Sequence, residues 1–292
     1  MKILLLGASG QLGWELQRAL APLGEVLTPG RADGADLAEP GRLEALARSI
    51  AADAIVNAAA YTAVDKAESE PALVRRINAE SVGRLAGVAR ETGALLLHYS
   101  TDYVFDGSGD APRDESAPTG PLSVYGQTKL EGEQAIQASD CRHLILRTSW
   151  VYAARGGNFA KTMLRLAAER EQLRVVDDQV GAPTGAELIA DCSAHALRQC
   201  LANASAGGLY HLAARGSTSW ADYARFVIDQ ARRRGQVLRC REVVGIPSQD
   251  YPTPARRPLN SRLDCRRFEA DFRLRLPEWQ PGVIRMLAEV LA

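Results

Sequence analysis

A tyrosine and a lysine four residues apart form a pair that could carry out acid–base chemistry. Tyr125 and Lys129 lie in the pattern Tyr-x-x-x-Lys within a stretch that predicts a helix over residues 124–138. Residues i and i+4 share one helix face, so both side chains should project to the same side. A nearby ammonium favours the phenolate and lowers the pKa of a phenol from about 10. Such a phenol could donate a proton to a ketone oxygen as hydride reaches the carbon.

Hydroxyl side chains end the apolar run that precedes this helix. Residues 95–99 predict a buried strand, and Ser100, Thr101 and Asp102 follow it. The carboxyl ends of parallel strands face the ligand crevice in an open α/β sheet. Ser100 and Thr101 are therefore both candidates to hydrogen-bond a substrate carbonyl, and the alternative for either hydroxyl is local capping of the strand end.

Three glycines follow the first apolar run in the spacing Gly-x-x-Gly-x-x-Gly. Such glycines allow a tight turn and a close approach of the backbone to a pyrophosphate. The helix that follows points its N–H groups at the same place. A strand before and a helix after are the context that a dinucleotide site requires, although a merely structural turn is the alternative. The candidate residues are Gly7, Gly10, Gln11, Leu12 and Gly13.

The end of the second predicted strand bears on the choice between NADPH and NADH. An acidic residue there would bind a ribose 2′-hydroxyl, but this chain has Arg31, which could pair with a 2′-phosphate. We expect NADPH and leave NADH open. Asp36 and Leu37 could flank the adenine. Ala59 and Ala60, past the third strand, would let a cofactor run close to the backbone.

Strand-length apolar runs alternate with helical periodicity through residue 150. This order predicts a doubly wound α/β fold with a parallel sheet and right-handed crossovers, Rossmann-like, and it includes one long helix over residues 72–92. We expect residues 1–150 to form a dinucleotide-binding domain that also takes segments near 173–215 and 240–250. Residues 151–292 should mainly form a smaller, discontinuous substrate lobe, with a constrained proline-rich loop over 247–258.

Composition excludes several classes of protein. The 292 residues carry 35 basic and 35 acidic side chains, so a broad basic surface for nucleic acid or anionic membrane is not expected. No apolar stretch approaches the ~20 residues that span a bilayer. The five cysteines form no Cys-x-x-Cys pair, which favours reduced thiols and a cytoplasmic location. The four histidines fit no acid–base pattern and are interpreted as structural.

Longer motifs resemble a known enzyme family. The glycine loop, the strand-end hydroxyls and the Tyr-x-x-x-Lys helix together resemble the extended short-chain dehydrogenase/reductase superfamily. Within it, the chain resembles the dTDP-4-dehydrorhamnose reductases over essentially its whole length. The stretches that carry this closer resemblance are Asn57–Glu68, Ser100–Gly107, Arg147–Tyr152, Gly181–Thr184 and Pro254–Ser261.

The resemblance implies an activity and a set of site residues. The family reduces the 4-keto group of dTDP-4-dehydro-L-rhamnose to give dTDP-L-rhamnose, a sugar donor for cell-envelope polysaccharides. Carried over, Thr101, Tyr125 and Lys129 would be catalytic. The other implied contacts are Gly10, Gln11, Leu12, Asp36, Leu37, Ala59, Ala60 and Tyr61 with the cofactor, and Thr101, Asp102 and Trp150 with the substrate.

The resemblance also implies a homodimer with a structural Mg²⁺. The glutamates that would match are Glu15 and Glu187, since carboxylates suit Mg²⁺, although both could be solvated on helix faces. The substrate's diphosphate needs cations, and Arg256 and Arg257 are candidates because guanidinium groups match phosphate oxygens. Trp150 could pack on the sugar or, alternatively, serve as a core residue between the lobes.

Two other functions stay open at the level of sequence. One is a nucleotide-sugar epimerase or dehydratase on the same fold, which would keep NAD(H) bound through a cycle. A dehydratase would usually need further acid and base residues, whereas Thr101-Asp102 offers one carboxylate. The other is a regulatory subunit that binds a cofactor without turnover. The joint presence of Thr101, Tyr125 and Lys129 argues against it.

Overall fold

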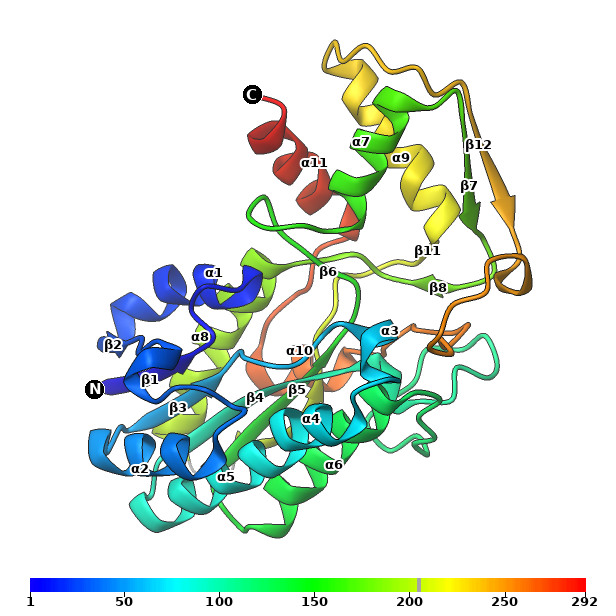
Figure 1. The fold of residues 1–292 in the computed structure, drawn as a ribbon. Helices are drawn as coiled ribbons and strands as arrows, with labels where there is room; N and C mark the ends of the chain where they lie inside the picture. Colours follow the sequence, from blue (N-terminus) through cyan, green and yellow to red (C-terminus); the bar gives the residue numbers. More distant parts are fainter. Residues whose placement is uncertain (204–205) are drawn as a thin grey trace.

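Six parallel strands form the central sheet of the computed structural model, which describes residues 1–203 and 206–292. Their order across the sheet is β10-β5-β4-β3-β1-β2, which confirms the expected doubly wound α/β fold (Figure 1). The chain leaves β1 for β2 on one side and reaches β3 on the other, so the crevice of such folds opens at the ends of β1 and β3. The strands are β1 (Lys2–Leu6), β2 (Glu25–Leu27), β3 (Ala54–Asn57), β4 (Leu95–Thr101), β5 (His143–Thr148) and β10 (Gly208–His211).

Helices cover both faces of this sheet, which explains why its strands are continuously apolar. Every residue of β3 and β4 is buried. Alternate side chains enter two separate cores: Leu5 packs with the helices of one face and Leu4 with those of the other. The first face carries α1 (Gln11–Leu20), α8 (Ala186–Ala202) and α10 (Arg266–Phe272), and the second carries α2 (Pro40–Ile50), α5 (Ser81–Thr92) and α6 (Val124–Ala138).

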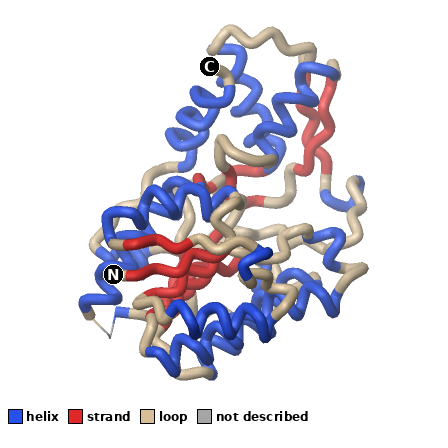
Figure 2. Tube along the Cα trace, turned by 60° about the vertical axis from the view of Figure 1, so that its left-hand side comes forward, coloured by secondary structure: helices blue, strands red, loops and turns tan. Residues whose placement is uncertain are grey.

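A smaller lobe lies beyond the carboxyl ends of the strands (Figures 1 and 2). Its core contains Tyr223, Val227, Trp279 and Val283. Its elements are α7 (Phe159–Glu169), α9 (Trp220–Arg233), α11 (Trp279–Val290), and the parallel pair β7 (Gln172–Val176) and β12 (Glu242–Ile246). Two short pairs run between lobe and sheet: β6 (Val151–Tyr152) with β9 (Thr184–Gly185), and β8 (Val180–Gly181) with β11 (Thr218–Ser219).

Individual segments of the second half fall in different layers. The segment near 173–215 supplies α8 and β10 to the sheet and its covering layer. The strand β7 and the segment near 240–250 do not join that sheet, because β7 pairs with β12 in a sheet of their own. Which strand a segment pairs with depends on residues far away in the sequence, and local periodicity does not specify it. The division at residue 150 itself stays a prediction.

The long helix expected over residues 72–92 is interrupted. The chain forms α4 (Pro71–Arg75), then a π-helical turn η3 (Arg76–Glu80), then α5. Single π turns inside helices occur frequently at functional sites. Within the described residues the other short helices are α3 (Val64–Ala67) and the 3₁₀ turns η1 (Ala21–Leu23), η2 (Arg31–Asp33), η4 (Asp102–Val104) and η6 (Ser248–Asp250), the last within the proline-rich loop.

Two further expectations concern the state of the cysteines and the length of apolar helices. All five cysteines are free thiols, and four of them are buried. Within the described ranges 1–203 and 206–292, no helix combines the length and the apolar character that a membrane span requires.

Candidate active site

The fold brings Thr101, Tyr125 and Lys129 together at the end of β4. Ser123 caps α6 by accepting a hydrogen bond from the backbone N–H of Gly126, so the helix begins beside Tyr125. Thr101 is the last residue of β4, and its hydroxyl lies close enough to the Tyr125 phenol to lower the pKa of that group. The hydroxyl and the phenol thus lie at the strand end where ligands bind in such sheets, and the Lys129 amine contacts the backbone of the same strand at Tyr99.

The Tyr125 phenol is more reluctant to ionise than its sequence pattern suggests. Burial raises its pKa to about 12, against the opposing effect of Thr101, and the negative charge of Asp102 adds to the rise. The expectation that Lys129 lowers this pKa was therefore wrong for the protein alone. The reason is that desolvation penalises a phenolate and that Lys129 has other partners.

The amine of Lys129 is held by two residues of β4. Its side chain is 2% exposed, and Nζ donates to the backbone oxygen of Tyr99 at 2.6 Å. Nζ also lies 3.0 Å from Nε2 of His98. Burial lowers the pKa of Lys129 to about 8, although the carboxylate of Glu133 opposes this shift.

Asp102 lies next to the Thr101 hydroxyl. The hydroxyl of Thr101 donates to its Oδ1 at 3.0 Å, while Oδ2 is buried and has no hydrogen-bond partner among the described residues. Burial raises the pKa of Asp102 to about 6, which exceeds the opposing effects of the Ser261 and Thr101 hydroxyls. Ser100, the other candidate hydroxyl, is buried with its Oγ unpartnered, and Thr101 is the one that reaches Tyr125.

The glycine loop packs directly against the segment after β3. Gly7 has φ +81°, and a Cβ there would lie 2.7 Å from the backbone nitrogen of Ala59. A Cβ on Gly13 would lie 2.0 Å from the carbonyl oxygen of Gly7. Only glycine fits at both places, because any side chain would collide with backbone atoms. The two glycines therefore let the loop turn tightly at the crevice between β1 and β3. Gly10, Gln11, Leu12 and Ala60 all keep exposed or half-exposed positions around it.

The residues expected around the adenosine end lie along the same edge. Arg31 is exposed at the start of η2. Asp36 is half-buried, and its Oδ1 accepts from the N–H of Ala38. Leu37 is 5% exposed and packs into the core, so it can offer a ligand little of its side chain. Tyr61 is half-buried and donates to Glu70 at 2.7 Å.

Two residues expected to bind substrate have protein partners. The ring of Trp150 stacks on Trp220, with centroids 3.5 Å apart. One face of Trp150 therefore packs against the smaller lobe, in line with the alternative that Trp150 is a core residue between the lobes. Trp150 has φ +47°, in the left-handed region that bulky side chains rarely adopt. Arg257 is paired with Asp65 at 2.7 Å, whereas Arg256 is exposed. Their roles towards substrate stay predictions.

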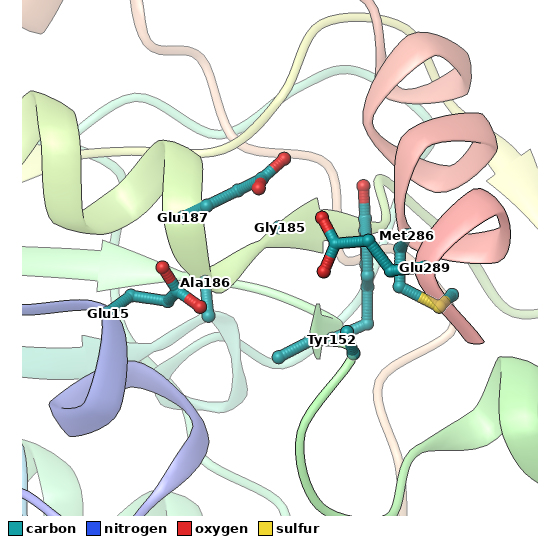
Figure 3. Close-up of a pocket in the computed structure, with 9 residues that line it drawn as sticks. Glu15, Tyr152, Gly185, Ala186, Glu187, Met286 and Glu289 are labelled. Carbon is teal, nitrogen blue, oxygen red and sulfur yellow. The ribbon is translucent and has the colours of Figure 1, made fainter. Parts of the chain in front are cut away.

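Glu15 and Glu187 lie beside the same hollow, together with Glu289 and Tyr152 (Figure 3). Arginines accompany these carboxylates: Arg18 lies 3.5 Å from Glu15, and Arg285 lies 3.4 Å from Glu187. No group of three or more His, Cys, Asp or Glu side chains in the described ranges could hold a metal ion. The expected Mg²⁺ at Glu15 and Glu187 is therefore not supported.

Three polar residues of the site were not singled out from the sequence. His98 contacts Lys129, and Asn57 contacts His98. Asn78, in the π turn, accepts from the N–H of Tyr61 and donates to its carbonyl oxygen. Asn57 and His98 are cross-strand neighbours in β3 and β4. Their contact could have been predicted from the sheet register that the fold class implies.

The fold, the glycine loop and the Thr-Tyr-Lys cluster together define an extended short-chain dehydrogenase/reductase. The family described as "RmlD substrate binding domain" matches residues 1–292, and the chain belongs to this family. Its curated relatives include the dTDP-4-dehydrorhamnose reductases of Escherichia coli K12, with 56% identity, and Salmonella typhimurium, with 55%. Each match covers 99% of this chain and 98% of the relative.

Solved structures show the same likeness. A dTDP-4-dehydrorhamnose reductase from Clostridium acetobutylicum superposes with a TM-score of 0.90 at 33% identity, covering 100% of both chains. The enzyme from Bacillus anthracis, solved in complex with NADP, gives a TM-score of 0.89 at 31% identity and covers 99% of both chains. A UDP-glucose 4-epimerase from Thermus thermophilus, at 19% identity and a TM-score of 0.81, shares the fold.

Proposed function

We propose that this chain is a dTDP-4-dehydrorhamnose reductase. It reduces the 4-keto group of dTDP-4-dehydro-6-deoxy-L-mannose with NAD(P)H and gives dTDP-L-rhamnose, which serves cell-envelope polysaccharide synthesis. The observation that carries the proposal is the cluster of Thr101, Tyr125 and Lys129 at the carboxyl end of β4, within a chain that matches this family along its whole length.

Each residue of the cluster has a distinct task. Thr101 binds and polarises the C4 carbonyl oxygen. Tyr125 donates its hydroxyl proton to that oxygen, and the high pKa of the phenol keeps the proton in place until the oxygen gains charge. Lys129 orients the ribose hydroxyls and offsets the charge of the phenolate that forms. Asp102 and Trp150 contact the sugar, and Arg257 approaches the diphosphate.

The cradle at Gly7, Gly13 and Ala59 fits a dinucleotide, because a Cβ at either glycine would collide with backbone. When bound, the reduced nicotinamide supplies the hydride. Gly10, Gln11 and Leu12 begin α1, whose N–H groups face the pyrophosphate. Arg31 pairs with a 2′-phosphate, so NADPH should be used better than NADH. We also propose a homodimer and a cytoplasmic location, which light scattering and cell fractionation test.

The test follows the absorbance of reduced nicotinamide with enzymatically generated keto-sugar. The wild type should oxidise one NADPH per ketone reduced, and faster than NADH. Tyr125→Phe should lower kcat by about 10²- to 10⁴-fold, because the proton donor is lost while the aromatic ring remains. Tyr99→Phe is the matched control: its hydroxyl bonds Ser193, on the helix layer of the opposite face, and activity should stay within a few-fold of wild type.

Other outcomes favour the alternative functions. A sugar product formed without net consumption of NADPH would indicate an epimerase or dehydratase. A folded protein that binds cofactor but oxidises neither NADPH nor NADH would overturn the proposed substrate and favour a regulatory subunit.

A further inference from the structure

A buried chain of polar groups runs from the catalytic lysine to the cofactor loop. Lys129, His98 and Asn57 are exposed by 2%, 0% and 1%, so water does not complete their hydrogen bonds. Nζ of Lys129 lies 3.0 Å from Nε2 of His98, and Nδ1 of the same imidazole lies 3.1 Å from Nδ2 of Asn57. Oδ1 of Asn57 in turn accepts from the backbone N–H of Ala59 at 3.2 Å.

The orientation of the Asn57 amide determines which imidazole nitrogen carries the proton. Because Oδ1 accepts from Ala59, the NH₂ group of Asn57 must face His98 and donate to Nδ1. The opposite orientation would set the NH₂ group against the N–H of Ala59, with two donors facing each other. A neutral imidazole that accepts at Nδ1 carries its single proton on Nε2.

That Nε2–H group points at Lys129. An ammonium has three donors and no acceptor, whereas an uncharged amine can accept one hydrogen bond and still donate. We propose that His98 is a positioning residue: it donates to Lys129, favours the neutral amine over the ammonium, and couples the protonation of Lys129 through Asn57 to the Ala59 backbone. The amine donates at the same time to the carbonyl oxygen of Tyr99, at 2.6 Å.

The surroundings of Lys129 agree with this arrangement. Burial is the largest influence on its pKa and lowers it, and burial also holds the pKa of His98 well below its usual range. Glu133, one turn further along α6, raises the pKa of Lys129, but its carboxylate is held by Arg147 of β5 at 2.6 Å.

The groups on the site side are Tyr125, one turn earlier on α6, and Asp102 of η4. Burial favours the neutral form of each of them.

This coupling has a consequence for the reaction, and here the inference rests on the proposed function. A neutral phenol and a neutral amine can be buried together at low cost, whereas a lone ammonium cannot. Lys129 can become an ammonium only if His98 stops donating to it. The imidazole proton must then move to Nδ1 and the Asn57 amide must rotate, which releases the Ala59 N–H in the cofactor loop. Binding at that loop and the charge of Lys129 therefore influence each other.

Direct titration of Lys129 tests the inference without turnover. The chain has four lysines, and Lys2, Lys66 and Lys161 are at least partly exposed, so lysine labelled with ¹³C at Cε gives few signals. Loss of one signal in Lys129→Met assigns it. We expect Lys129 to titrate near pH 8, well below the ordinary lysine value of about 10.4.

Variants at two points of the chain should move that titration. In His98→Gln an amide oxygen can accept from the ammonium without any tautomer change, so the Lys129 midpoint should rise by about one pH unit. Asn57→Ser removes the amide that donates to Nδ1 of His98, so the Lys129 midpoint should rise in this variant too. Either variant can serve as the test if the other does not fold. His211→Gln, a buried histidine of β10 bonded to Arg113, is the matched control and should leave the midpoint unchanged.

Two results would overturn the inference: a wild-type Lys129 that titrates at or above the ordinary lysine value of about 10.4, or an unchanged midpoint in both His98→Gln and Asn57→Ser. A wild type that shows the expected titration yet reduces no keto-sugar would contradict the proposed function alone.

Discussion

Burial sets the resting charge of the side chains around the reacting atoms. The pKa of Tyr125 rises to about 12, that of Lys129 falls to about 8, and that of Asp102 rises to about 6, and desolvation is the largest cause in each case. All three shifts favour the uncharged form, because a low-dielectric site penalises charge of either sign. The fold therefore brings the pKa values of Asp102 and Lys129 close to neutral pH, so a small change in their surroundings can change the charge of either group.

Asp102 makes the stability of the protein depend on pH in a direction opposite to that of most carboxylates. Its folded pKa is raised from 3.8 to about 6, so the folded state binds more protons than the unfolded state between these values. This group therefore costs stability progressively as pH rises through that window. Asp102→Asn should be more stable than wild type by about 1–3 kcal/mol at pH 7, and the gain should shrink by pH 4.

Urea unfolding at the two pH values measures this difference. Asp114→Asn is the control, because this exposed carboxylate accepts from Ser116 and its pKa is lowered. A larger gain for Asp102→Asn at pH 4 than at pH 7 would contradict the assigned direction.

At the scale of elements, a π turn and a helix glycine shape the edge of the cofactor site. A Cβ on Gly132 of α6 would lie 2.3 Å from the carbonyl oxygen of Asn78 in η3. The missing side chain lets η3 settle against α6, where Nδ2 of Asn78 reaches Thr128 at 3.3 Å. From there Asn78 holds both backbone groups of Tyr61, just past Ala60. The interruption of the helix is thus tied to the site.

Gly132→Ala should weaken both stability and cofactor binding. The added methyl must displace backbone, so we expect a loss of about 1–3 kcal/mol in unfolding free energy and a raised Kd for NADPH. Gly87→Ala is the matched control on α5, since nothing lies within 4 Å of its added Cβ, and alanine should stabilise that helix by about 0.5–1 kcal/mol. Chemical unfolding and fluorescence titration with NADPH check both. Equal behaviour of the two variants would contradict the close approach.

At the scale of the whole molecule, distant parts of the chain close over the sheet edge. Asp65 of α3 accepts from Arg257 at 2.7 Å and from the N–H of Ala255 at 3.2 Å, which ties the proline-rich loop to the first half of the chain. Hydrogen bonding from Arg257 lowers the pKa of Asp65. Residues 190 positions apart are thereby fixed beside the crevice.

Loss of this tie should free the loop. In Asp65→Asn we expect trypsin to cleave after the exposed Arg256 several-fold faster than in wild type, because local opening exposes the chain. Mass spectrometry of the early fragments identifies the cut. Glu169→Gln removes the partner of Arg165 in an exposed pair on α7 and should leave the rate unchanged. An unchanged rate at Arg256 in Asp65→Asn would show that other contacts hold the loop.

Much of the fold followed from local pattern. The helix Val124–Ala138 agrees with expectation to the residue, since apolar period and capping are properties of neighbouring residues. The glycine spacing after β1 likewise predicted a turn that the structure shows in contact with Ala59.

The sequence by itself determined the class of fold, the family and the Tyr-x-x-x-Lys face of α6, because each depends on periodicity or on a contiguous motif. Only the tertiary structure decided the pairing of β7 with β12, the contact of Lys129 with His98 and the pairing of Arg257 with Asp65. It also decided the direction of the Tyr125 pKa. These features depend on which residues the fold brings into contact and on how much water it excludes from them. Neither is determined by the residues adjacent in the sequence.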